Sequence, residues 1–511
     1  MTAIASAIFA LPPFPGSRPC PVVVAPTPDT QLNAAIAPAD MIAALRRHQV
    51  GGAFWREDDI WSARDVTLPV RGAGDDSILL LGALAGRPLV ATSQGPFSGL
   101  AEHPPGSTER ESALEMLVGH HLLDETSYAD PFTGEPLDPL ALIEILAVWR
   151  NLIQANRPIA AAFGFAHWKR DTVDPLLWGG SPVPFRPSRA SELAALPAGA
   201  TVAVWKARVP TAFLAELEAG PWRLVEVEDG FIRSAGLGAD CVPPLSIVVD
   251  DLGVHYDRSR PNRLEEMLTR NDSGPVAQAR ARHLREWLVR TGVSKYGVGA
   301  GAPLPRFGGE RRHILAVGQV EDDRSMLFGS GNVRSNLELL RRVRTQAPDA
   351  WIIYRPHPDV EAGHRRGAIP RQVALELADQ IEPAQPISAL IAMADEVHVM
   401  TSLAGFEALL QGKTVTTHGT PFFAGWGLTR DLAPISEPGR RNVALTIDQL
   451  VAGVLLRYPR YLDPVTNLPC TAEILVMRLL SGIQRQNAAL VPLRRLVGWA
   501  NRAAARLVGT R

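Results

Sequence analysis

Residues 313–319 read HILAVGQ, residues 351–359 read WIIYRPHPD, and residues 396–402 read EVHVMTS. Each is a short apolar run rich in β-branched residues, and a helical pattern follows it, which is typical of strands that alternate with helices. Such alternation builds parallel sheets with right-handed crossovers. The sequence therefore predicts an α/β lobe over residues 310–470.

A second set of strands and helices precedes this lobe. Strands are expected in TVAVWKA (201–207), WRLVEVEDG (222–230) and PPLSIVVDD (243–251), with helical patterns between and after them. The Gly- and Pro-rich stretch 297–309 is typical of a linker. We therefore predict a first Rossmann-like lobe over residues 128–300, so that two α/β lobes face a cleft.

An internal repeat extends the pattern to the N-terminal part. YADPFTGEP (128–136) and YLDPVTNLP (461–469) share five identities at a constant offset of 333 (461 − 128), and four leucine or valine positions upstream match at the same offset. We interpret residues 1–127 as a degenerate α/β remnant of a duplicated module that has lost its front part.

Composition is ordinary for a globular protein of several domains. The chain has 511 residues, 46% of them hydrophobic, and 52 Lys and Arg balance 53 Asp and Glu. The hydrophobic fraction, with 21% charged residues, excludes disorder, and the charge balance gives no basic field for nucleic acid. Three distant cysteines favour a reducing compartment, and the N-terminus lacks the basic start of a secretory signal. We expect a cytoplasmic protein.

Polar residues follow the three strands of the 310–470 lobe, where ligands of open α/β sheets bind. A His-Pro pair is often a plain turn, a Thr-Ser pair a plain helix cap, and an acidic run a solvated loop. Their coincidence at three successive strand ends favours a ligand site instead. Its candidates are Gln319, Glu321, Asp322, Asp323, Arg355, His357, Asp359, Thr401 and Ser402, where the last two would cap a phosphate-binding helix, with Glu407 placed for a ribose hydroxyl.

A fourth polar cluster lies in VEVEDGFIRSAGLG (225–238) of the first lobe. Glu228 and Asp229 end a strand and are candidates for acid–base chemistry, with Arg233 and Ser234 as candidate substrate ligands. The dinucleotide motif GxGxxG is absent, as are HExxH, a Walker loop and paired CxxC motifs. We interpret His120-His121 as structural and predict no metal site.

These motifs together resemble KpsC/LipB-type capsular polysaccharide proteins, which are β-Kdo glycosyltransferases. The resemblance rests on EDGFIRSAGLGAD, PPLSIVVDDLGVHYDRSRPNRLE, TGVSKYG, QVEDD, RPHPD, TSLAGFEALLQGK and GTPFFAGWGLTRD, and GFAHWKRD (164–171) also looks like a family segment. It implies a GT-B-like fold with an acceptor-side first lobe and a donor-side second lobe. It also implies retaining transfer of Kdo from CMP-Kdo, with no other cofactor, to a lipid-linked or glycan acceptor in capsule synthesis and export.

The resemblance assigns roles by position. Gln319 and Asp323 match a QxxxD motif with Asp323 as nucleophile, and His357-Pro358 match an HP motif that contacts the CMP phosphate. Further roles are expected for Arg355 and Lys413 (phosphate), Glu228 or Asp229 (base), and Lys295 and Tyr296 (Kdo carboxylate or acceptor). The remnant lacks the QxxxD and HP motifs, so at most one active site is expected. Transfer of another sugar and a non-catalytic scaffold are the alternatives.

The C-terminal tail 471–511 contains seven arginines interleaved with apolar residues and no acid after Glu473. Such a tail is typical either of an amphipathic helix on an anionic inner leaflet or of a docked helix. The lipid-linked acceptor that the resemblance implies favours the peripheral membrane location.

Overall fold

The computed structural model describes residues 2–25, 36–62, 67–234, 242–295, 297, 299, 301–435 and 440–483. It divides into two compact units. Unit 1 comprises residues 1–160, 174–184 and 465–469, and unit 2 comprises residues 161–173, 185–464 and 470–511. The predicted division between residues 127 and 128 therefore falls inside unit 1.

The second lobe of unit 2 is a parallel sheet of six strands in the order β12-β11-β10-β13-β14-β15. Its strands are β10 (His313–Val317), β11 (Trp351–Arg355), β12 (Gln380–Ile381), β13 (Glu396–Val399), β14 (Thr414–Thr417) and β15 (Arg430–Asp431). In chain order this is 3-2-1-4-5-6, the strand order of a dinucleotide-type Rossmann fold. The predicted α/β lobe is confirmed, and its three quoted strands are the central ones.

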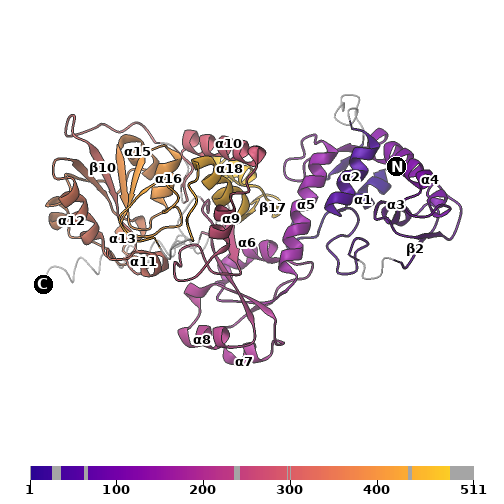
Figure 1. Cartoon of the computed structure of the whole chain (residues 1–511), viewed down its shortest axis with the longest axis horizontal. Coiled ribbons are helices and arrows are strands. Elements are labelled where there is room, and N and C mark those ends of the chain that lie inside the picture. Colours follow the sequence, from indigo (N-terminus) through magenta and orange to yellow (C-terminus); the bar gives the residue numbers. More distant parts are fainter. Residues whose placement is uncertain are drawn as a thin grey trace. The chain divides into compact units, whose positions relative to one another are not determined.

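Helices contact both sides of β10, among them α12 and α15 (Figure 1). Ser335 and Glu338 form a reciprocal capping box that starts α12, and Leu339, Leu340 and Val343 of this helix are buried against the sheet. The helices of this lobe are α11 (Arg324–Gly329), α12 (Asn336–Gln346), α13 (Pro358–Glu361), α14 (Arg371–Leu375), α15 (Ile387–Met393) and α16 (Ala404–Leu410).

The first lobe is built on a sheet in the order β17-β16-β9-β8-β7-β5-β6. Its strands are β5 (Ile159–Phe163), β6 (Phe185–Arg186), β7 (Thr201–Val204), β8 (Arg223–Asp229), β9 (Ser246–Asp250), β16 (Pro459–Leu462) and β17 (Pro469–Cys470). Its helices are α6 (His167–Leu177), α7 (Ala190–Ala194), η4 (Lys206–Arg208), α8 (Thr211–Ala219), α9 (Arg263–Arg270) and α10 (Pro275–Thr291).

This sheet departs from the predicted all-parallel arrangement. Strand β9 runs antiparallel to β8, and the described residues between them, 230–234 and 242–245, contain no crossover helix. Strand β16 pairs antiparallel with β9, so the chain returns from the second lobe to the first before residue 470. The second lobe therefore ends before residue 459 and not at the predicted residue 470, because residues 459–462 belong to the first lobe's sheet.

The segment that leads into β16 and beyond contains α17 (Ile447–Val451), the π-turn η6 (Ala452–Arg457) and α18 (Ala472–Leu480). Helix α18 packs its buried Leu475 and Leu479 inward, and its Arg478 forms an ion pair with the buried Asp463. The first arginine of the predicted basic tail is thus docked. The other six, from Arg485 to Arg511, lie outside the described residues, so the membrane prediction for this tail remains a prediction.

Unit 1 contains a smaller α/β arrangement. Its elements are α1 (Thr2–Ile8), β1 (Val23–Val24), α2 (Pro38–His48), β2 (Val70–Gly72), α3 (Ser77–Leu84), β3 (Leu89–Ala91), η2 (Ser98–Ala101), α4 (Thr108–Val118), the π-turn η3 (Gly119–Asp124), β4 (Ser127–Tyr128) and α5 (Pro139–Asn156). Strands β2 and β3 are parallel and α3 connects them, in the same order as β13, α16 and β14.

The two repeat segments also share local structure. The π-turns η3 and η6 begin at Gly119 and Ala452, which are 333 residues apart. In each segment a tyrosine hydroxyl donates to the carbonyl six residues earlier: Tyr128 to Leu122 at 2.8 Å, and Tyr461 to Leu455 at 2.7 Å. The register of the sequence repeat is therefore also the register of the structure.

Among the described residues, no helix is both long enough and apolar enough to cross a membrane.

Candidate active site

A cleft of about 550 Å³ lies between the two lobes of unit 2. From the first lobe it is lined by Lys169, Trp205, Glu228, Asp229, Arg233 and Lys295. From the second lobe it is lined by Gln319, Asp323, Ser325, His357, Thr401 and Ser402. The structure thus brings most of the predicted site residues together in one place.

Gln319 and Thr401 mark the point in the second lobe's sheet where the strand order reverses. They follow β10 and β13, which are neighbours in the sheet although two strands separate them in sequence. The Gln319 Nε2 donates to Thr401 Oγ1 at 3.0 Å, and its Oε1 accepts from the Thr401 backbone N–H at 2.7 Å. This two-way clamp fixes the floor of the cleft at the position where doubly wound sheets bind ligands.

Asp323 is the N-cap residue of α11. Its Oδ2 accepts from the backbone N–H of Ser325 at 3.2 Å and from the Ser325 hydroxyl at 2.6 Å. These bonds hold one carboxylate oxygen and fix the rotamer at the cleft wall. A carboxylate held in one orientation at a cleft wall is placed as a nucleophile needs to be.

His357 lies at the end of β11 and N-caps the short helix α13, in which Pro358 is the first residue. Its Nδ1 accepts from the Asp359 backbone N–H at 3.1 Å. Burial lowers the pKa of His357 to about 4, so the ring is neutral near pH 7. A neutral imidazole that accepts at Nδ1 carries its proton on Nε2, which makes His357 a hydrogen-bond donor to a ligand.

On the first-lobe side, Asp229 is held between two cations. Arg233 Nε donates to its Oδ2 at 2.8 Å, and Lys169 Nζ donates to its Oδ1 at 3.2 Å. Burial would raise the pKa of Asp229, but Arg233 and Lys169 outweigh it and hold the pKa well below its usual range. Asp229 therefore stays ionised and holds the side chains of Lys169 and Arg233 in place.

Glu228 behaves differently from its neighbour. Burial and the charge of Asp229 raise the pKa of Glu228 to about 7. Its Oε1 accepts from the Tyr256 hydroxyl at 2.8 Å, and that hydroxyl in turn accepts from Arg324 Nε at 3.1 Å. The charge of Asp323, on the other lobe, acts on Glu228 as well as on His357. A carboxylate with a pKa near 7 is suited to accept a proton.

Lys295 lies where the first lobe passes into the linker. Its backbone N–H donates to Glu407 Oε1 at 3.1 Å, and its carbonyl accepts from the N–H groups of Arg233 and Ser234. Burial raises the pKa of Glu407 to about 7. Glu407 thus supports the Lys295 backbone and is not among the described cleft-lining residues. Tyr296, predicted beside Lys295, lies outside the described residues.

Two predicted phosphate ligands are placed elsewhere. The guanidinium of Arg355 donates to the carbonyls of Glu382 and Pro383. Lys413 directly precedes β14, so it lies at the amino end of that strand, where its Nζ donates to the Ala392 carbonyl at 2.7 Å. Both residues hold backbone together instead of facing the cleft.

The expected cap of α16 also differs in detail. Helix α16 begins at Ala404, whose backbone N–H donates to the Ser402 hydroxyl at 3.3 Å, whereas the Thr401 hydroxyl is used by Gln319. The N-cap residue of α16 is Leu403, which makes no side-chain cap bond, so the predicted Thr401–Ser402 cap is wrong. Ser402 lies one residue before the N-cap, and Thr401 is part of the clamp.

Sequence reasoning missed several cleft residues. Lys169 lies in α6, and its Nζ is 3.3 Å from the centroid of the Trp205 ring. Burial lowers its pKa to about 8. Tyr256, Arg324 and His255 also line the cleft. Lys169 belongs to GFAHWKRD, and His255 and Tyr256 belong to GVHYDRSR. Both segments were noted in the sequence, but these residues do not directly follow a predicted strand, so the strand-end rule did not select them.

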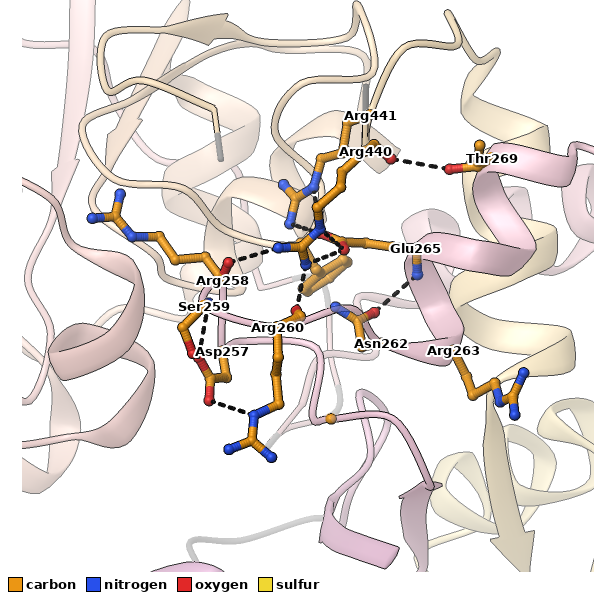
Figure 2. Close-up of polar contacts among 12 residues, drawn as sticks. Asp257, Arg258, Ser259, Arg260, Asn262, Arg263, Glu265, Thr269, Arg440 and Arg441 are labelled. Carbon is orange, nitrogen blue, oxygen red and sulfur yellow. Dashed lines mark hydrogen bonds and ion pairs between the residues drawn. The ribbon is translucent and has the colours of Figure 1, made fainter. Parts of the chain in front are cut away.

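A buried ionic cluster ties α9 to residues 421–424, next to the cleft. Figure 2 shows Glu265 of α9 with Arg440 and Arg441. Arg441 Nε donates to Glu265 Oε1 at 2.8 Å, and Arg441 Nη1 donates to the carbonyls of Pro421 and Ala424 at 2.7 and 2.8 Å. Pro421 lines the cleft. Glu265 therefore positions this part of the wall through Arg441.

We expect Glu265→Gln to destabilise unit 2 by about 3 kcal/mol, because it leaves two largely buried guanidinium groups without their countercharge. The control is Glu266→Gln. Its carboxylate is the neighbouring one, 36% exposed, and pairs with Arg263 at the surface, so its loss is expected to cost at most about 0.5 kcal/mol. Hydrogen exchange of the α9 amides in rising urea measures both. Equal protection in the two variants would contradict this role of Glu265.

Comparison with known proteins places this site in a family. The family model "Capsule polysaccharide biosynthesis protein" matches residues 202–292 and 300–461, the stretch that holds most of the cleft residues. The capsule polysaccharide modification protein LipA of Neisseria meningitidis serogroup B is 38% identical over 382 residues, which are 74% of this chain and 53% of LipA. The lipopolysaccharide-processing protein LpsZ of Rhizobium meliloti is 42% identical over 259 residues, 50% of this chain and 56% of LpsZ.

Solved structures are similar to this chain as well. The β-Kdo 2,7 transferase of Thermosulfurimonas dismutans KpsC is 34% identical, with a TM-score of 0.51, and the match covers 63% of this chain and 99% of that one. The β-Kdo 2,4 transferase of the same protein is 28% identical, with a TM-score of 0.53, and covers 63% and 98%. The chain spans a little over half the length of the curated relatives it matches. It belongs to the KpsC/LipB-type family of capsule polysaccharide biosynthesis proteins and has the GT-B-like α/β fold of that family.

Proposed function

We propose that unit 2 is a retaining β-Kdo transferase that moves Kdo from CMP-Kdo to a lipid-linked Kdo or other glycan acceptor during capsule polysaccharide biosynthesis. The observation that carries the proposal is the meeting of Asp323 and His357 with Glu228 across one cleft. The 34% identity to a solved β-Kdo transferase, over 99% of its length, supports the same assignment.

The second lobe takes the donor. The anomeric carbon of Kdo is a ketal carbon, so its substitution passes through an oxocarbenium-like transition state that a carboxylate stabilises. Asp323 attacks this carbon, the bond from the carbon to the phosphate oxygen breaks, and CMP leaves. His357 donates its Nε2 proton as a hydrogen bond to the departing phosphate, and the Gln319–Thr401 clamp supports the donor from the cleft floor.

The first lobe completes the reaction. The acceptor hydroxyl attacks the anomeric carbon from the face that CMP left, the bond to Asp323 breaks, and the hydroxyl proton passes to Glu228. Two inversions give net retention. Lys169, Arg233 and Lys295 supply positive charge for the Kdo carboxylate on the donor or the acceptor, and Ser234 is held by Arg233 at 2.8 Å.

We also propose that unit 1 is the remnant of a second transferase module. The shared register of η3 and η6, and the parallel β2–α3–β3 unit, support this origin. None of the cleft-lining residues belongs to unit 1, which supports a single site in this chain. A cytoplasmic location and a tail that meets the inner membrane or the export machinery remain proposals that follow from a lipid-linked acceptor.

The experiment is a transfer assay with the purified chain, CMP-Kdo generated in situ and a β-Kdo-terminated lipid acceptor, with CMP-sialic acid as the second donor. We expect a mass gain of one Kdo on the acceptor and no product from CMP-sialic acid. Product from CMP-sialic acid and none from CMP-Kdo would show that the chain transfers a sugar other than Kdo. No product from either donor, with the folded protein intact, would favour the non-catalytic scaffold.

A further inference from the structure

Unit 1 contains a cluster of three metal-ligand side chains that lies outside the cleft. It is formed by His120, His121 and Glu125, whose ligand atoms all lie within 4.8 Å of one another. His120 Nε2 is 3.4 Å from Glu125 Oε1, and His121 Nδ1 is 3.8 Å from Glu125 Oε2. Ligand atoms around a tetrahedral zinc, with bonds of about 2.1 Å, stand about 3.4 Å apart. The His120–Glu125 distance matches this spacing, and the whole set, within 4.8 Å, is close enough to share one ion after small side-chain shifts.

The backbone explains why the sequence did not predict this cluster. Adjacent histidines followed by a glutamate match no helical metal motif, because neighbouring side chains diverge on an α-helix. Here His120 and His121 lie in the π-turn η3, whose wider turn brings both rings to Glu125. Isolated π-turns are often found at functional sites. The interpretation of His120-His121 as structural stays a prediction, and the cluster gives an alternative to it.

The internal repeat supplies an independent comparison. The equivalent π-turn η6 keeps the backbone conformation but has Gly453, Val454 and Tyr458 at the three positions, 333 residues later. The fold of the turn thus does not require histidine or glutamate. All three ligand-type residues occur together in one copy and are all absent from the other.

Two of the ligand atoms have no other use in the described structure. His121 Nδ1 and Glu125 Oε2 are buried and have no hydrogen-bond partner among the described residues, which is costly for polar atoms unless something else satisfies them. The His121 side chain is 11% exposed, and its ring packs edge-on against Phe97 at 5.4 Å. The His120 side chain is 56% exposed, so the cluster is open to solvent on that side.

We propose that His120, His121 and Glu125 bind a divalent transition metal of the zinc class, with solvent in the remaining coordination positions. Two imidazoles and one carboxylate are a donor set that suits zinc. The proposal concerns unit 1 alone and does not depend on the transferase assignment.

The test is zinc binding by the full chain without an affinity tag, in competition with a chromophoric chelator, together with the visible spectrum of bound Co²⁺. The variants are Glu125→Gln and His121→Phe. The matched control is His48→Gln, because His48 Nε2 lies 3.1 Å from Glu144 Oε1 in the same unit but belongs to no three-ligand cluster among the described residues. Melting temperatures in EDTA establish that each variant is folded.

We expect the wild type and His48→Gln to bind one zinc ion equally well, and the two cluster variants to bind it at least about 10-fold more weakly. Zinc should raise the melting temperature of the wild type and not that of Glu125→Gln. Equal zinc affinity in the wild type and Glu125→Gln, or no zinc bound by the wild type, would overturn the proposal.

Discussion

Asp323→Asn is expected to lower kcat for Kdo transfer by about 10³-fold or more, because an amide cannot form the covalent intermediate. The substitution is nearly isosteric, and asparagine caps helices as well as aspartate, so the bond to the Ser325 N–H and the start of α11 should persist. Steady-state transfer from CMP-Kdo measures the effect.

The matched control is Asp322→Asn. Asp322 is the adjacent, more exposed carboxylate and pairs with Arg365 at 3.2 Å. This variant should retain kcat within about 2-fold, since surface ion pairs contribute little. If Asp323→Asn kept more than a tenth of the wild-type kcat, Asp323 would not be the nucleophile.

Glu228→Gln is expected to lower kcat by about 10²- to 10⁴-fold, the usual contribution of a general base. The base acts in its ionised form, and burial together with Asp229 raises the pKa of Glu228 to about 7. The wild-type rate should therefore fall as the pH drops through about 7 and reach a plateau above it. Glu228→Gln should lose this acidic limb as well as the rate.

Tyr256→Phe separates this role from a structural one. The Tyr256 hydroxyl stabilises the ionised Glu228, so its removal should raise the pKa of Glu228 further and move the acidic limb to higher pH. The plateau rate should change much less than in Glu228→Gln. An acidic limb that stays in place in Tyr256→Phe, or that survives in Glu228→Gln, would assign the titration to another group.

The second lobe and its site were largely predictable from sequence. Short apolar runs with polar ends identified β10, β11 and β13, and the rule that ligands bind at the carboxyl ends of strands identified Gln319, Asp323, His357 and Thr401. These residues share one edge of one sheet, so their meeting follows from the topology alone.

The rule that residues at strand ends line the ligand site fails for Arg355 and Lys413, whose side chains point away from the cleft. Arg355 is itself the last residue of β11, and its side chain reaches backbone carbonyls near the end of β12. Lys413 precedes β14 and so lies at the opposite edge of the sheet, which its position in the sequence already indicated.

The first lobe was less predictable because its site residues come from different kinds of elements. Lys169 comes from a helix and donates to Asp229, whereas Tyr256 comes from a loop and donates to Glu228, so tertiary packing and not strand order brings them to the end of β8. The return of β16 to β9 is a contact between segments about 200 residues apart, for which the local pattern holds no information.

The most direct test of the central claim is to search for the covalent intermediate. The protein is incubated with CMP-Kdo without acceptor, quenched, and examined by intact-protein mass spectrometry and peptide mapping. We predict a mass gain of one Kdo residue on the peptide that contains Asp323, absent in Asp323→Asn and discharged when acceptor is added. An adduct on another residue, or transfer to acceptor with inversion at the anomeric carbon, would contradict the double-displacement account.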